Sequence, residues 1–297
     1  MKTKDSLSLI WLAAIWGASF LFMRVAVPEF GAVPLITIRV ALASLCLLPL
    51  VFWRGKQTEM LRAILPISIV GIINSAIPFT LIAYSTLYVT AGFASILNAA
   101  TPIFSALIAF IWLRERPQKT AILGLLVGVV GVILLVWDKI GFTNNEQSKT
   151  AIAILAGLVS TLAYGIGANY SKIKLVGVDP VTITAGSQLV AAIALSPLAV
   201  YWWPEETPSF SSWMYASLLA ILCTAIAQII YFRLIQNIGA TSTTTVTFLI
   251  PVFGLLWGFL FLNETILVDT VIAGGIILLG TALANGLLKT KKKEAKT

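Results

Sequence analysis

Polar side chains able to form hydrogen bonds lie inside long apolar runs of this sequence. In the run NAATPIFSALIAFIWLRER, Asn98, Thr101 and Ser105 share one helical face, because residues three or four positions apart stack along a helix. Pro102 lies among them; it lacks an N–H group and displaces the carbonyl group of Asn98. Amide and hydroxyl groups at this spacing suit the binding of a polar solute.

A second run, TFLIPVFGLLWGFLFLNET, repeats the arrangement. Pro251 follows Pro102 by 149 residues (251 − 102) and displaces the carbonyl group of Thr247. Thr247 occupies the place of Asn98, and Thr243 lies one turn before it. We predict helix kinks at Pro102 and Pro251 and expect the two polar faces to frame one central site.

Other polar or aromatic residues at depth extend this candidate site. The predicted solute-binding residues are Trp16, Phe20, Asn74, Asn98, Thr101, Tyr164, Asn169, Gln228, Thr243 and Thr247. A pocket walled by aromatic rings with a few amides would suit a small amphipathic solute such as an amino acid or an organic amine. The alternative is that the small residues only let helices pack closely.

The residues required for several kinds of catalysis and metal binding are missing from this sequence. The chain has no histidine and two cysteines, Cys46 and Cys223, far apart within apolar runs, so a metal cluster or a histidine-based triad has no ligands or base. There is no phosphate-binding loop pattern and no acidic residue in the middle of an apolar run. We therefore expect no catalysis, no metal and no cofactor.

Arg24 and Arg39 are the basic residues within apolar runs, and they leave two alternatives open. One of them meets a carboxylate or phosphate on the solute, or each lies near the outer boundary, where it extends to the surface or pairs with Glu29. The second alternative is favoured at this point.

The elements that would position these residues are membrane-spanning helices. With 59% hydrophobic and 11% charged residues and a mean hydropathy of +0.96, the chain is too apolar for an ordinary soluble protein. Charged or Pro/Gly-rich breaks separate apolar segments of near spanning length. They lie at about 6–27, 33–53, 62–87, 91–113, 119–137, 150–171, 180–203, 211–236, 241–262 and 268–288.

The shared 149-residue register predicts a duplicated five-helix unit. Glu115 and Glu264, like Gly131 and Gly280, keep the same separation as the prolines. An odd number of spans per unit turns the second copy upside down in the membrane, as in many secondary transporters. The predicted fold is an all-α integral membrane protein of ten transmembrane helices in two inverted-topology repeats, residues 1–148 and 149–297.

The basic residues predict the orientation. With the amino terminus inside, most lysines and arginines, including those of the tail KTKKKEAKT, lie on the cytoplasmic side. The net charge of +8 therefore indicates membrane topology and not nucleic-acid binding. We expect a multi-pass protein of the cell membrane with both termini in the cytoplasm.

The chain also resembles a known family. The stretches WLRERPQKTAILGLLVGVVGVILL and FLNETILVDTVIAGGIILLGTAL are similar to the ends of EamA-type repeats of the drug/metabolite transporter superfamily, and IWGASFLFMRVAV is similar to their first helix. The likeness covers nearly the whole chain. The family often has glycine before each glutamate, where this chain has Arg114 and Asn263.

The inverted repeat predicts a transporter that works by alternating access. The resemblance implies that it exports small metabolites or drugs. The expected partners are a small-molecule solute and the lipid bilayer, with a homodimer possible through glycine-bearing helix faces. The alternative is a membrane scaffold or receptor subunit that transports nothing. An intramembrane enzyme is disfavoured, because a buried acid pair and a base are missing.

Overall fold

The computed structural model describes residues 3–114, 119–137, 139 and 145–284. Within these ranges all regular secondary structure is helical. The first half of the chain contains α1 (Thr3–Phe30), α2 (Ala32–Trp53), α3 (Gln57–Arg62), α4 (Ile64–Gly71), η1 (Ile72–Ala76), α5 (Ile77–Ser85), α6 (Ala91–Asn98), α7 (Thr101–Leu113) and α8 (Lys119–Val136). The second half contains α9 (Asn145–Lys174), α10 (Pro180–Tyr201), α11 (Phe210–Ala220), η2 (Ile221–Ile226), α12 (Ala227–Ile238), α13 (Ala240–Thr243), α14 (Val246–Leu262) and α15 (Val268–Ala284).

The long helices follow the apolar runs, because a backbone in lipid has to satisfy its hydrogen bonds within its own segment. Eight helical stretches among the described residues are long and apolar enough to cross a membrane. α14 and α15 are apolar but shorter, at 17 residues each. The largest difference from the expected bounds is in α9, which begins at Asn145 rather than at about 150, so the predicted unit boundary falls inside this helix.

Two spanning stretches contain π-helical segments, which the sequence did not predict. η1 interrupts the stretch from α4 to α5, and η2 interrupts the stretch from α11 to α12. Their first residues, Ile72 and Ile221, are 149 positions apart (221 − 72). A π-helical turn inserts an extra residue into the ladder of backbone hydrogen bonds and is frequent at functional sites. Both halves of the chain therefore carry the same irregularity at the same register.

The two prolines have different local consequences. The chain turns at Ala99 and Ala100 between α6 and α7, immediately before Pro102. The hydroxyl of Thr101 donates to the displaced carbonyl oxygen of Asn98 at 2.7 Å. α14, in contrast, continues without interruption through Pro251, and the corresponding break lies earlier, at residues 244–245. A kink at Pro251 itself stays a prediction.

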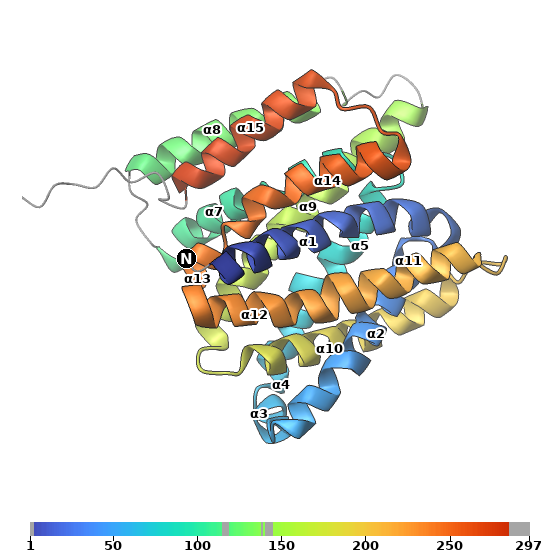
Figure 1. The fold of residues 1–297 in the computed structure, drawn as a ribbon, viewed down its shortest axis with the longest axis vertical. Coiled ribbons are helices and arrows are strands. Elements are labelled where there is room, and N and C mark those ends of the chain that lie inside the picture. Colours follow the sequence, from blue (N-terminus) through green and yellow to red (C-terminus); the bar gives the residue numbers. More distant parts are fainter. Residues whose placement is uncertain (1–2, 115–118, 138, 140–144, 285–297) are drawn as a thin grey trace, which may run out of the picture.

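Helices from the two halves of the chain pack in matching pairs. α2 packs along α10, α1 packs along α14, and α9 packs against α7. Figure 1 shows α8 and α15 side by side at one edge of the molecule, opposite the edge that holds α3. The main hydrophobic core lies among α1, α2, α5, α6 and α11. The residues at its centre are therefore held by helices that are far apart in sequence.

Glycines bring α8 and α15 into direct backbone contact. A Cβ atom added at Gly124 would lie 2.6 Å from the carbonyl oxygen of Gly280, and one added at Gly280 would lie 2.7 Å from the carbonyl oxygen of Gly124. A Cβ at Gly131 would meet the backbone of Ile277. These glycines therefore let two helices of one chain pack closely, and a homodimer through glycine-bearing faces stays a prediction.

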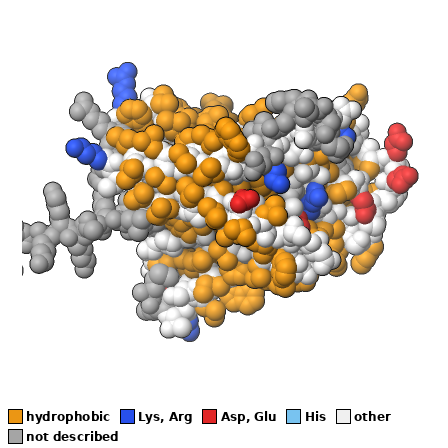
Figure 2. Space-filling model, turned by 90° about the horizontal axis from the view of Figure 1, so that it is seen from above, with side chains coloured by type: hydrophobic (Ala, Val, Ile, Leu, Met, Phe, Trp, Pro, Cys, Tyr) orange, Lys and Arg blue, Asp and Glu red, His pale blue; other side chains and the backbone are white. Residues whose placement is uncertain are grey.

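The outer surface of the α8/α15 edge is apolar. Exposed side chains on α8 include Leu126, Val130 and Leu134, and those on α15 include Ile272 and Leu279. Figure 2 shows hydrophobic side chains over much of this face, with most of the acidic side chains in view gathered toward one end. A large exposed apolar surface with charges at its ends is typical of a protein that lies in a bilayer.

Candidate functional site

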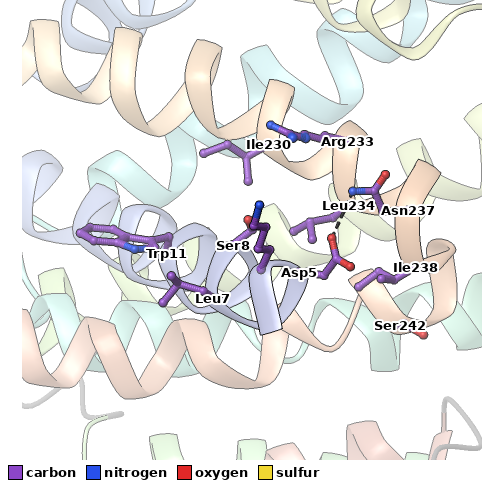
Figure 3. A pocket seen from close by; sticks show the side chains of 11 residues that line it. Asp5, Leu7, Ser8, Trp11, Ile230, Arg233, Leu234, Asn237, Ile238 and Ser242 are labelled. Carbon is purple, nitrogen blue, oxygen red and sulfur yellow. Dashed lines mark hydrogen bonds between the residues drawn. The ribbon is translucent and has the colours of Figure 1, made fainter. Parts of the chain in front are cut away.

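A cleft opens between the first turns of α1 and the end of α12. Its volume is about 1120 Å³, and Figure 3 shows side chains from α1, α12 and α13 around it. Its polar lining is made by Lys4, Asp5, Ser8, Arg233, Asn237 and Ser242. The amide of Asn237 donates to the carboxylate of Asp5 at 3.1 Å, so the two helices are joined at the rim (Figure 3).

An aromatic pair lies near this cleft. The cleft reaches Trp11 on α1 and Ile230 on α12. Farther along α1, the ring of Trp16 lies 5.3 Å from the ring of neighbouring Tyr231, measured between centroids. Both side chains are half-buried. The predicted site residue Trp16 therefore forms part of a contact that joins α1 to α12.

Arg39 lies at the centre of the molecule, about 10 Å along α2 from its beginning. Its side chain is only 6% exposed. Its Nε donates to the hydroxyl of Thr224 in η2 at 2.9 Å, and its guanidinium carbon lies 3.8 Å from the centroid of the Phe79 ring. The remaining polar contact is a long one, 3.9 Å from Nη1 to the sulfur of Met23.

This placement contradicts the favoured expectation for Arg39. The residue neither reaches a boundary nor pairs with Glu29, whose carboxylate instead accepts from the backbone N–H of Ser209 at 2.6 Å and from its hydroxyl at 2.9 Å. The expectation was wrong because the apolar run shows where a residue lies along its helix but not which face meets the neighbouring helices. Arg24 is half-buried and donates to the carbonyl oxygen of Thr86.

The equivalent place in the second half is held by Gln188. It follows Arg39 by 149 residues (188 − 39), and its Nε2 donates to the hydroxyl of Ser75 in η1 at 3.1 Å. Ser75 and Thr224 are themselves 149 residues apart (224 − 75). In both halves a polar side chain therefore holds a hydroxyl in the π-helical segment of the other half. Gln188, Ser75 and Thr224 were not predicted as site residues, and Arg39 was considered only in the less favoured of two alternatives, although the common register was a signal that could have found all four.

Some predicted residues lie near this centre. Tyr164 is half-buried, with its ring 6.1 Å from that of Phe79, and thus flanks the ring on which Arg39 rests. Gln228 is half-buried on α12 between Thr224 and Tyr231. The Cβ and Oδ1 atoms of Asn74 in η1 lie against Gly167, where an added Cβ would come within 2.8 Å and 2.9 Å of them.

The remaining predicted residues are engaged by the protein itself. Asn169 is 4% exposed, and its amide donates to the Ser105 carbonyl at 2.9 Å, the Ser105 hydroxyl at 3.1 Å and the Gly165 carbonyl at 2.9 Å, which fastens α9 to α7. The hydroxyls of Thr243 and Thr247 donate within their own segment, to the carbonyls of residues 239 and 244 at 2.8 Å. Phe20 is 4% exposed in the core, and Asn98 is half-buried at the break before α7. Their roles in solute binding stay predictions.

Contacts between segments far apart in sequence join the end of the molecule opposite the large cleft. Glu264, which follows α14, accepts from the backbone N–H groups of Ala91 at 2.8 Å and Gly92 at 3.3 Å in the first turn of α6. A smaller hollow of about 330 Å³ lies beside it. The counterpart Glu115 lies outside the described residues. Among the described residues, no group of three or more His, Cys, Asp or Glu side chains could hold a metal ion.

The family comparison matches the chain twice. The model of the EamA-like transporter family matches residues 5–137 and 151–286. The two matches together cover most of the chain.

Full-length relatives carry transporter names. An "Uncharacterized transporter" of Archaeoglobus fulgidus is 28% identical, covering 95% of this chain and 98% of its own length. The "Uncharacterized inner membrane transporter YedA" of Escherichia coli K12 is 26% identical over 93% of this chain and 89% of its own. A "Probable terminal-alkyne amino-acid exporter" of Streptantibioticus cattleyicolor is 24% identical over 98% of this chain and 96% of its own.

A solved crystal structure shares the fold. It superimposes with a TM-score of 0.66 at 19% sequence identity and covers 97% of this chain and 98% of its own. At this identity the likeness concerns the fold alone.

Proposed function

This chain belongs to the EamA-like transporter family, and on that premise we propose that it exports small amino acids or related amphipathic metabolites across the cell membrane by alternating access. It is a multi-pass membrane protein and a transporter, as its family and its apolar helices indicate. Alternating access means that one central site opens to each side of the membrane in turn. The proposal includes no catalytic step.

The relation between the two halves supports this mechanism. A Cβ added at Gly17 would lie 2.6 Å from the Cβ of Phe253, and one added at Gly165 would lie 3.1 Å from the backbone of Phe104. Phe104 and Phe253 are 149 residues apart (253 − 104). Gly17 on α1 thus packs against α14, and Gly165 on α9 packs against α7. In each case a glycine of one half meets a helix of the other half. Such exchanged contacts are expected when two halves are related by a pseudo-two-fold axis, which is the inverted arrangement we propose.

The observation that carries the proposal is the asymmetry between the two ends. A polar cleft of about 1120 Å³ opens where α1 begins, with one hydrogen bond across its rim from Asn237 to Asp5. At the opposite end the hollow beside Glu264 measures about 330 Å³, and Glu264 and Glu29 join neighbouring segments there. With both termini in the cytoplasm, the cleft faces inward, and the protein adopts an inward-facing conformation. Exposure of the centre to the outside would require the contacts of Glu264 and Glu29 to break.

The solute class rests on the lining and on one relative. The centre combines aromatic rings with amide, hydroxyl and guanidinium groups, a mixture suited to a small amphipathic molecule. The relative from Streptantibioticus cattleyicolor is named a probable amino-acid exporter. Small amino acids are therefore the first solutes to test.

A flux assay tests the proposal directly. The purified protein is placed in liposomes and offered labelled amino acids, nucleobases and organic cations, with and without a pH gradient. We expect amino-acid flux that the Asn98→Leu variant loses and that a matched Ile122→Leu variant, changed on the exposed face of α8, keeps. A protein that moves none of these solutes, or an Asn98→Leu variant whose flux is normal, would favour the scaffold or receptor-subunit alternative.

A further inference from the structure

The guanidinium group of Arg39 is a buried cation without a counterion. The two ion pairs found among the described residues join Arg54 to Asp179 at 3.7 Å and Lys56 to Glu59 at 2.7 Å, and neither involves Arg39. The described acidic side chains lie at or beyond the ends of the spanning stretches: Asp5, Glu29, Glu59, Asp179, Glu205, Glu206, Glu264 and Asp269. A charge at membrane depth is costly, and such residues tend to mark a functional site.

The protein contacts of Arg39 leave part of the guanidinium group free. Nε is engaged by Thr224, one face of the group lies on Phe79, and Nη1 has only the weak and distant sulfur acceptor of Met23. Nη2 has no acceptor among the described residues. The Nη1–Nη2 edge of a guanidinium group matches the two oxygens of a carboxylate, which it binds with two parallel hydrogen bonds.

Gln188 shows that the structural contact does not require the charge. Its amide makes the corresponding hydrogen bond to Ser75 in the other π-helical segment, and it is as deeply buried as Arg39, at 3% exposed. A neutral amide is therefore sufficient to hold such a hydroxyl. The first half nevertheless carries a full positive charge at this place, and the helix contact does not explain that charge.

We propose that Arg39 is the residue that binds the carboxylate group of the transported solute. The inference rests on the proposed function and narrows it: solutes with a carboxylate, such as zwitterionic amino acids and monocarboxylates, bind, whereas organic cations and amides bind poorly. Arg39 is 6% exposed in this conformation, so a solute reaches it only after the surrounding helices separate. The Trp16–Tyr231 contact joins α1 to α12 beside the cleft, and we expect it to open when these helices separate.

The test compares carboxylate-bearing solutes with their amides. Binding of amino acids and of the corresponding amino-acid amides is measured by intrinsic tryptophan fluorescence of the purified full-length protein in detergent. The wild-type protein is expected to prefer the acid. Arg39→Gln, which reproduces the side chain of Gln188 and keeps a donor for Thr224, is expected to lower affinity for the acid by about thirtyfold or more while leaving affinity for the amide unchanged. Arg39→Lys keeps the charge without the planar fork and is expected to fall between them.

Two binding results would overturn the inference. A wild-type protein that does not prefer acids over amides overturns the inference, whether or not the variants fold. So does an Arg39→Gln protein that is monodisperse, unfolds near the wild-type temperature and retains the preference. If binding of the acid depends on Arg39 but no flux occurs in liposomes, this inference stands and the proposed transport is overturned. If the Arg39→Gln variant still transports acids, the proposed transport stands and this inference is overturned.

Discussion

Arg114 and Asn263, 149 residues apart (263 − 114), share a left-handed backbone conformation with φ of 53°. Among the described residues they are the two non-glycine positions with positive φ. Arg114 ends α7, and Asn263 ends α14. Each donates its N–H group to the carbonyl five residues back, on Ala109 and Gly258 respectively. The glycine that the EamA family often has before each glutamate has its physical reason here, since glycine adopts this conformation without strain.

Replacement of Arg114 by glycine should stabilise the protein. A left-handed residue with a Cβ atom costs roughly 1–2 kcal/mol, partly offset by the larger chain entropy of unfolded glycine. Arg114→Gly is therefore expected to raise the free energy of unfolding by up to about 1 kcal/mol. Asn263→Gly should change it little, because asparagine tolerates this conformation. Thermal unfolding in detergent checks both, and equal effects of the two variants would contradict the argument.

The α8/α15 contact should not tolerate a side chain at Gly280. Leucine there would meet the backbone of Gly124, and overpacking typically costs about 1–3 kcal/mol. Gly275→Leu is the matched control on the same helix, since a Cβ at Gly275 meets nothing within 4 Å. Unfolding temperatures of the two variants are compared. Equal temperatures would show that the two helices do not pack as closely as described.

Glu264 should stabilise the first turn of α6. Its carboxylate accepts from two N–H groups that have no partner within the helix. Glu264→Gln removes the charge and one acceptor, and is expected to cost about 1 kcal/mol and to speed hydrogen exchange at the Ala91 amide. Glu205→Gln, at an exposed position, serves as the control. Unchanged exchange at Ala91 in the Glu264 variant would refute this role.

The Trp16–Tyr231 contact should restrict access from the cleft. A cysteine introduced at position 228, in a background without Cys46 and Cys223, reports access to the centre through its rate of labelling by a polar thiol reagent. Trp16→Ala should raise that rate roughly two- to tenfold, because aromatic pairs contribute about 0.5–1.5 kcal/mol. Trp11→Ala, which removes an exposed ring from the cleft wall, should not. The same rate in both variants would exclude the pair as a barrier.

The loop before α10 should loosen in acid. Glu59, outside the spanning segments, has its pKa lowered by the hydrogen bond from Lys56, and then by the backbone N–H of Asp179, which donates to it at 2.6 Å. A lowered folded-state pKa means that ionised Glu59 stabilises the fold fully above its unfolded value of 4.5, and that this stabilisation is lost as the pH falls through the lower folded value. The protection factor of the Asp179 amide, which corrects the exchange rate for its intrinsic pH dependence, should then fall below pH 4.5, and Glu59→Gln should abolish that fall.

Much of the fold could be predicted from the sequence, because in lipid each spanning segment satisfies its own backbone. The apolar runs located the helices, and the segment expected at 91–113 coincides with α6 through α7. The break before Pro102 followed from the missing N–H of proline, but the π-helical segments did not, since they arise from one extra residue per turn and leave no compositional mark.

The site was predicted less well. The spacing of Asn98, Thr101 and Ser105 indicated that they share one helical face. It did not indicate that Asn169 of another helix donates to Ser105. Nor did it indicate that Arg39 contacts Thr224, 185 positions away. Periodicity indicates which residues share a face, but it does not indicate which other helix that face meets. Arg39 was accordingly expected at a boundary and lies at the centre.

The sequence by itself determined the number and position of the apolar segments, the repeated register and the scarcity of acidic groups within the membrane. These depend on local backbone chemistry and on composition. Only the tertiary structure decided that Arg39 donates to Thr224 and Gln188 to Ser75, each in the π-helical segment of the other half. These contacts depend on the angles at which the helices cross and on the side chains that their packing buries together.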